Sequence, residues 1–330
     1  MKIKVIDKGG EIRADDFEYA PGYVFTTDPA CVDYDWLVVF DEFPKEDRGT
    51  FRNGCEELRC PRERTILCTW EPVSVKAYSR AYTRQFGHYL SNRPWSAERH
   101  PHYHLGRGYY IWYVDRPYAE VVAKTDYPKD KVISAVCSAK RMRHTAHHFR
   151  YALIDHLMRT VPGLDWYGRK FRPIDRKYRL LDGYKYHLAV ENHIAPNHWS
   201  EKLSDPLLCE CLPFYAGDPE VGRILPPESF IPIPIDDPAA AERIIKTAIA
   251  NGEYEKRLPA IREARRLLIA KYNFWAQVIA VIEESAGQAV SAADPSRPVR
   301  LYARRTIRRH NPLAALDDAW HRLKLQLGIW

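Results

Sequence analysis

Two basic side chains lie where this chain could bind an anion. Arg150 and Lys202 each stand near the start of a segment with helical apolar spacing, and each segment follows a predicted strand. A helix N-terminus offers free N–H groups and a partial positive charge, and a guanidinium can hold a phosphate through two hydrogen bonds. Alone, either cation would by default belong to a surface ion pair. Their placement at the carboxyl ends of parallel strands fits the rule for ligand sites.

A carboxylate follows another predicted strand. Glu71 comes directly after the apolar segment 65–69 and Trp70, and Pro72 restricts the turn that follows. A carboxylate at the end of a strand could act as a general base that takes the proton of a substrate hydroxyl. The alternative interpretation is a glutamate in an exposed turn.

Other arrangements of reactive side chains are incomplete. The sequence has no G-x-x-x-x-G-K-[ST], H-E-x-x-H or G-x-S-x-G motif, which argues against P-loop, zinc-protease and nucleophile-elbow sites. Asp33-Tyr34-Asp35 could bind a metal, but it precedes a predicted strand, where a solvated start of the strand is the better interpretation. His100, His102 and His104 have no carboxylate or thiol at a suitable spacing and are typical of a surface loop. We therefore expect no metal site.

The elements that must position these side chains predict α/β architecture. From 131 to 216 the pattern alternates between strands and helices, which is typical of a parallel sheet covered by helices. The segment 238–285 is helical. In the first third of the chain we expect buried strands at 5–6, 36–40, 65–69 and 109–114.

The length of 330 residues indicates about two domains. We predict an α/β domain at 1–128, with a linker over 115–131, and a second domain at 129–285. Residues 286–330 are predicted to form a hinge and a helical, basic, amphipathic C-terminal tail.

The positive charge is concentrated in that tail. Residues 297–330 carry eight basic and two acidic side chains, a net charge of +6 out of +7 for the chain. The rest of the protein is nearly neutral, which argues against nucleic acid as a partner. Arg300–Trp330 also contains leucines and tryptophans, so it could contact an anionic membrane surface or pack back on the first domain. Because no apolar run approaches the ~20 residues of a membrane span, we expect a cytoplasmic protein, peripheral on the inner membrane face if it docks there.

Several separated motifs resemble those of one enzyme family. Four of them fall in 184–231: Tyr184–Asn192 (YKYHLAVEN), Trp199–Leu203 (WSEKL), Pro213–Pro219 and Leu225–Ile231. Three more lie upstream, at Thr145–Arg150, Asp165–Arg169 and Leu67–Pro72. The first four are similar to the core donor-binding motif of the family 10 glycosyltransferases of bacterial type, the α-1,3/1,4-fucosyltransferases. The three upstream segments resemble other conserved segments of the same family. Because Arg150 and Lys202 both fall in these motifs, the resemblance favours phosphate binding by the two cations over surface ion pairs.

This resemblance implies a GT-B-type enzyme with two Rossmann-like domains facing across a cleft. It makes 1–128 the acceptor-binding α/β domain and 129–285 the nucleotide-sugar-binding domain. It implies an inverting, single-displacement transfer of fucose from GDP-fucose to a glycan such as a surface polysaccharide or lipopolysaccharide, with Glu71 as general base and no obligatory cofactor. It also implies five donor-binding residues: Arg150, Asn192, His198, Glu201 and Lys202. His198 stands where the family has a tyrosine, so another nucleotide-sugar is an alternative. A non-catalytic glycan- or membrane-binding protein of the same fold is the other alternative.

Overall fold

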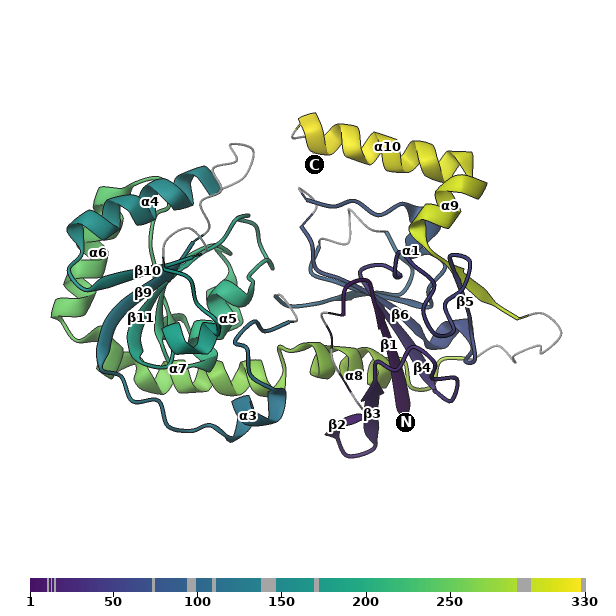
Figure 1. The fold of residues 1–330 in the computed structure, drawn as a ribbon, viewed down its shortest axis with the longest axis horizontal. Helices are drawn as coiled ribbons and strands as arrows, with labels where there is room; N and C mark the ends of the chain where they lie inside the picture. Colours follow the sequence, from purple (N-terminus) through teal and green to yellow (C-terminus); the bar gives the residue numbers. More distant parts are fainter. Residues whose placement is uncertain are drawn as a thin grey trace. The chain divides into compact units, whose positions relative to one another are not determined.

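The computed structural model describes residues 1–10, 12, 14, 16–72, 75–93, 99–108, 111–137, 147–168, 172–289 and 298–327 (Figure 1). The chain divides into two compact units: an N-terminal unit, Met1–Gly106 with Phe274–Trp330, and a central unit, Arg107–Asn273. This division differs from the expected one, because the C-terminal part of the chain returns to the N-terminal unit. Phe274 and Trp275 pack there on Phe25, with ring centroids 6.5 and 4.8 Å from it.

The N-terminal unit is built on a seven-stranded sheet. Its strands are, in spatial order, β2 (Phe17–Ala20), β3 (Tyr23–Thr26), β1 (Lys2–Asp7), β4 (Trp36–Phe40), β6 (Thr65–Thr69), β7 (His88–Ser91) and β8 (Tyr103–Leu105). Neighbouring strands are parallel except β2 and β3. Strands β4 and β6 are buried along their whole length, which is usual for parallel strands inside a sheet.

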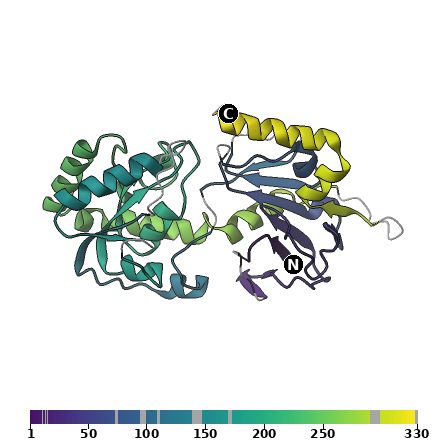
Figure 2. The ribbon, with the colours of Figure 1, turned by 45° about the horizontal axis from the view of Figure 1, so that its top comes forward.

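The C-terminal tail packs on this unit. Strand β14 (Arg300–Tyr302) pairs antiparallel with β5 (Cys55–Glu57). Helices α9 (Arg304–His310) and α10 (Pro312–Leu327) follow and contact α1 (Arg80–Thr83) (Figure 2). Helix α8 (Phe274–Glu284) contacts β7. The tail is therefore helical, as predicted.

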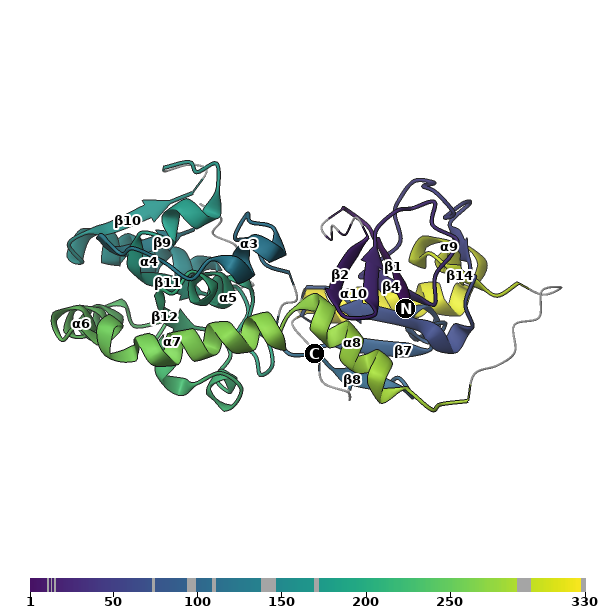
Figure 3. The same ribbon diagram turned by 90° about the horizontal axis from the view of Figure 1, so that it is seen from below.

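The central unit contains a five-stranded, fully parallel sheet. Its strands are, in spatial order, β10 (Leu164–Tyr167), β9 (Lys131–Val136), β11 (Tyr184–Val190), β12 (Leu212–Ala216) and β13 (Ile231–Pro232). Its α-helices are α3 (Tyr118–Ala123), α4 (His147–Thr160), α5 (Glu201–Leu208), α6 (Pro238–Ala250) and α7 (Glu253–Ala270). Helix α4 contacts α6 and β10, whereas α5 and α7 contact each other and β12 (Figure 3). The parallel sheets of the two units confirm the predicted α/β class.

Two local predictions are wrong. Residues 111–114, the described part of the expected strand at 109–114, form no strand. Instead, the Tyr113 N–H donates to Asp205 Oδ1 at 3.2 Å, and Val114 is buried in the core of the central unit. The histidines at 100–104 are not a surface loop, because His100 is buried and His104 lies in β8, paired with β7.

Candidate functional site

Glu191 and Ser200 join the end of β11 to the start of α5. Glu191 directly follows the strand and is 1% exposed. It accepts hydrogen bonds from the Ser200 N–H at 2.7 Å and from Ser200 Oγ at 2.6 Å. Ser200 is the N-cap of α5 and accepts from the Lys202 N–H at 3.2 Å. The first turn of α5 is thereby fixed to the carboxyl end of the sheet, where α/β proteins bind ligands.

Lys202 lies between two carboxylates in this first turn. Its Nζ is 3.0 Å from Glu201 Oε1 and 3.6 Å from Glu191 Oε2, and it donates to Ser200 Oγ at 3.0 Å. Burial alone would lower the pKa of Lys202, but the charges of Glu191 and Glu201 raise it, so the ammonium stays charged at neutral pH. Its side chain is 23% exposed, which leaves it accessible to a ligand.

Arg150 brings a second cation into the same cluster. It lies in the first turn of α4, is buried, and hydrogen-bonds the thiol of Cys137 just beyond β9. The charge of Arg150 lowers the pKa of Lys202, whereas Glu191 and Glu201 raise it. Strand β9 pairs with β11, so Arg150, held at the end of β9, and Lys202, held to Glu191 at the end of β11, lie at the same edge of the sheet although they are far apart in sequence. Residues 138–146, which hold the start of the upstream motif, lie outside the described residues.

The remaining predicted donor residues surround this pair. Burial would raise the pKa of Glu201, but the charges of Lys202 and Lys177 hold it at about 2. Asn192 follows Glu191, and its Oδ1 atom is buried with no hydrogen-bond partner among the described residues. Burial, with the neighbouring His193 and Lys202, lowers the pKa of His198 to about 3, so its ring is neutral at physiological pH.

Sequence reasoning missed three members of this cluster. Lys177, in the short helix η2 (Lys177–Leu180), places Nζ 2.6 Å from Asp205 Oδ2 and 3.5 Å from the carbonyl oxygen of Glu201. Burial raises the pKa of Asp205 to about 6 although Lys177 opposes it. Glu191 could have been found, because it directly follows a strand. Lys177 has no such signal, because its segment shows neither periodicity nor a motif.

Glu71 lines a cavity in the N-terminal unit. The cavity has a volume of about 960 Å³ and lies at the carboxyl ends of the adjacent parallel strands β1, β4 and β6. The residues that follow or end these strands, Asp7, Asp41 and Glu71, all line it. A half-buried carboxylate at such a strand end could take the proton of a hydroxyl group bound in the cavity.

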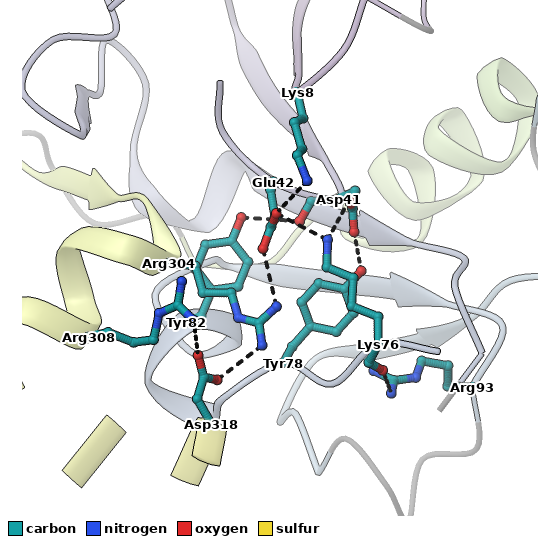
Figure 4. Close-up of polar contacts among 10 residues, drawn as sticks. All are labelled: Lys8, Asp41, Glu42, Lys76, Tyr78, Tyr82, Arg93, Arg304, Arg308 and Asp318. Carbon is teal, nitrogen blue, oxygen red and sulfur yellow. Dashed lines mark hydrogen bonds and ion pairs between the residues drawn. The ribbon is translucent and has the colours of Figure 1, made fainter. Parts of the chain in front are cut away.

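A network of charged side chains forms one wall of this cavity (Figure 4). Lys76 Nζ lies 2.6 Å from Asp41 Oδ2 and 3.2 Å from Glu42 Oε2. Lys8 and Arg304 reach the same Glu42 carboxylate at 3.3 and 3.2 Å. Burial would raise the pKa of Glu42, but the charges of Lys76, Arg304 and Lys8 lower it, so this carboxylate is ionised at neutral pH.

Metal ligands do not gather in the described part of the chain. No group of three or more His, Cys, Asp or Glu side chains there has an arrangement that could hold an ion. The histidines of β7 and β8 bond each other instead: His88 Nδ1 lies 3.1 Å from His104 Nε2, and His104 Nδ1 lies 2.9 Å from Glu284 Oε2. Burial and the neighbouring histidines lower the pKa of His88 to about 4.

The central unit also carries a family signature. Residues 127–246 match the model of "Glycosyltransferase family 10 (fucosyltransferase) C-term", and this range includes the whole cluster around Lys202. Residues 127–246 belong to glycosyltransferase family 10. For this family 10 domain, the family and the enzyme class predicted from the sequence, a glycosyltransferase, are confirmed.

Solved structures of glycosyltransferases are similar to the chain. A crystal structure of an α1,3-fucosyltransferase is 14% identical, with 86% of this chain and 88% of that chain covered and a TM-score of 0.48. The same kind of enzyme with GDP-fucose is also 14% identical, with 89% and 92% covered and a TM-score of 0.44. A sucrose-phosphate synthase from Thermosynechococcus elongatus is 10% identical, with 86% and 87% covered and a TM-score of 0.42.

Proposed function

We propose that the protein transfers fucose from GDP-fucose to a hydroxyl group of a glycan. The observation that carries this proposal is the cluster of Arg150, Lys202 and Lys177 at the carboxyl end of the parallel sheet, inside a family 10 domain. These cations surround the first turn of α5, whose N–H groups also favour anions. A nucleoside diphosphate is the ligand that such a cluster suits.

The donor-binding residues have distinct roles in this proposal. Arg150 and Lys202 hold the diphosphate and stabilise the negative charge that grows on it as the glycosyl bond breaks. Glu201 is ionised at neutral pH and accepts hydrogen bonds from ribose hydroxyls. Asn192 and His198 donate from their side chains, His198 as a neutral imidazole.

Glu71 is the proposed general base. The acceptor oxygen attacks the anomeric carbon from the face opposite the diphosphate and forms the new C–O bond. The bond between that carbon and the diphosphate oxygen breaks at the same time, and GDP leaves with the electron pair. Glu71 takes the proton of the acceptor hydroxyl. The configuration of the sugar is inverted, and no covalent enzyme intermediate forms.

The three cations supply charge for the leaving diphosphate. We therefore expect transfer to continue when divalent ions are chelated. Assays of GDP release with and without EDTA test this point, and loss of turnover that Mg²⁺ or Mn²⁺ restores would contradict it.

Calorimetry and turnover together test the function. Wild-type protein should bind GDP and GDP-fucose more tightly than UDP- or CMP-sugars, and should release GDP in the presence of a glycan acceptor. Lys202→Ala and Arg150→Ala should lose both properties, whereas Lys256→Ala, an exposed cation of α7 paired with Glu253, should keep them. Preference for a UDP-sugar would support the alternative donor. Binding of glycans without any turnover would support the non-catalytic alternative.

We also propose that the tail docks on an anionic membrane surface, where a lipid-linked glycan acceptor such as a lipopolysaccharide precursor would lie. Helix α10 packs through Ala314 and Asp318, which are 3% and 1% exposed. Its other side presents an exposed apolar stripe at helical spacing: Leu313, Leu316, Trp320 and Leu323. The neighbouring cations of α9 suit anionic lipid headgroups. None of the helices in the described ranges has the length and apolar character of a membrane-spanning segment.

Sedimentation with vesicles tests this contact. Vesicles of phosphatidylcholine with phosphatidylglycerol should bind the wild type and should bind Leu316→Glu/Trp320→Glu much less. Vesicles of phosphatidylcholine alone should bind neither protein well. Equal binding of the wild type and the double variant would refute the contact.

A further inference from the structure

The C-terminal tail reaches the cavity that contains Glu71. Strand β14 pairs with β5, and the next element, α9, begins at Arg304. The Arg304 side chain lines the cavity, more than two hundred residues along the chain from the strand ends that form the rest of it. This part of the tail therefore belongs to the cavity wall.

Arg304 is fixed from two sides. Its Nη1 lies 3.2 Å from Glu42 Oε1 in the cavity, and its Nη2 lies 3.2 Å from Asp318 Oδ1 on α10 (Figure 4). The guanidinium carbon lies 5.4 Å from the centre of the Tyr78 ring. The side chain is 11% exposed, and its Nε is buried without a hydrogen-bond partner among the described residues. A guanidinium held in this way gives Glu42 one orientation.

The carboxylates of this wall can still accept hydrogen bonds from hydroxyl groups. Within the described chain, Arg304 is the hydrogen-bond donor to Glu42 Oε1, and Lys8 and Lys76 lie at Oε2. A carboxylate oxygen has two lone pairs, so Oε1 can accept a second hydrogen bond. Asp41 has a backbone φ of +67°, an unusual conformation for a residue other than glycine, and this conformation sets the direction of the wall after β4.

The charge of the cavity favours a neutral occupant. Six acidic and five basic residues line it. Its most buried cations, Lys76 and Arg304, are already engaged by Asp41 and Glu42. Hydroxyl groups can donate to the remaining lone pairs of these paired carboxylates, whereas an anionic group would face the excess of acidic over basic residues that line the cavity.

We propose that Arg304 is a positioning residue of the acceptor site, which holds Glu42 so that Glu42 and Asp41 accept hydrogen bonds from hydroxyl groups of a neutral acceptor sugar beside Glu71. This inference rests on the proposed transferase function. The tail then has a role in the reaction that is independent of any membrane contact, because a residue at its start completes the acceptor site.

Kinetics of matched variants test the proposal. Arg304→Ala and Glu42→Gln should each raise the acceptor KM roughly ten- to hundredfold, the effect of losing a charge-assisted hydrogen bond, and leave the donor KM unchanged. Arg304→Lys keeps the charge and should recover part of the loss. Arg308→Ala is the control, because Arg308 pairs with the same Asp318 at 3.4 Å but does not line the cavity. It should keep the wild-type acceptor KM.

Thermal unfolding separates a positioning role from a structural one. If Arg304→Ala and Arg308→Ala lower the melting temperature and the activity in parallel, Arg304 only anchors the tail and the proposal is refuted. If no acceptor supports turnover, neutral and sialylated glycans on an array are compared for direct binding. Neutral glycans should bind the wild type and not Arg304→Ala, even where the transferase function has failed. An unchanged acceptor KM, a preference for sialylated glycans, or no glycan binding at all would overturn the inference.

Discussion

Replacing Lys202 by methionine tests the central cluster most directly. The substitution Lys202→Met keeps most of the side-chain volume and removes the ammonium group. In the folded protein, that group lies 3.0 Å from Glu201 Oε1 and 3.6 Å from Glu191 Oε2. Without it, Glu191 remains buried beside Glu201, and the hydrogen bonds from Ser200 still stabilise its charge. The variant should therefore lose stability and donor affinity together.

The size of both losses follows from burial. Exposed ion pairs contribute about 0–1 kcal/mol, and removing one partner of a fully buried pair costs about 3–5 kcal/mol. Lys202 is 23% exposed and Glu191 is 1% exposed, which places this pair between the two cases. We expect a loss of about 2–3 kcal/mol at pH 7.5. Loss of one charge-assisted contact with the diphosphate should weaken GDP binding roughly ten- to hundredfold.

The stability loss should also depend on pH. Burial raises the pKa of Glu191 in the wild type although Lys202 opposes this, and removing Lys202 raises it further. Between the ordinary glutamate pKa and this raised value, the folded variant binds a proton that the unfolded chain does not bind. Its stability therefore increases as pH falls, and the difference from the wild type should narrow between pH 8 and pH 5.

Urea unfolding at several pH values and calorimetry with GDP measure these effects. Lys185→Met is the matched control, because Lys185 pairs with Glu255 at 2.5 Å but both side chains are exposed. Lys185→Met should lower the free energy of unfolding by less than about 1 kcal/mol and leave GDP binding unchanged. If the difference in free energy of unfolding between Lys202→Met and the wild type stays constant from pH 5 to 8, Glu191 and Glu201 do not cause that difference. Wild-type GDP affinity in Lys202→Met would remove Lys202 from the donor site.

Three further changes probe other parts of the protein. Glu71→Gln should bind GDP as the wild type does and transfer roughly 10²–10⁴-fold more slowly, measured as GDP release; near-normal turnover would assign the base elsewhere. His198→Gln should change the donor KM by the same factor at every pH from 5.5 to 8, because the His198 pKa of about 3 keeps the ring neutral in this range. A step near pH 6.5 that appears in the donor KM of the wild type and is absent from that of the variant would contradict this. Trp199→Ala should cost about 3–5 kcal/mol in urea unfolding, since Trp199 is 1% exposed in the core of the central unit, and a loss below about 1 kcal/mol would contradict that packing.

The local apolar pattern of the sequence predicted the alternating strands and helices of the central unit. Strands β9, β11 and β12 and the helices between them match the alternation expected from 131 to 216, because each has strong apolar periodicity over a short stretch. Strand β8 was missed, since three residues are too few to show an alternating apolar pattern; its pairing with β7 is a tertiary contact. The expected strand at 109–114 was wrong for residues 111–114, because their apolar side chains serve tertiary packing rather than a sheet.

The sequence by itself determined the α/β class, the resemblance to family 10, the placement of Glu71 after a strand and the placement of Lys202 at the start of a helix. These depend on side-chain periodicity and on residues close together in the chain. Only the tertiary structure decided that Arg150 and Lys177 act on the same first turn of α5 as Lys202, and that Arg304 lines the cavity of Glu71. Such contacts join segments far apart in sequence, and they form where buried carboxylates require cations, a requirement that composition and spacing do not reveal.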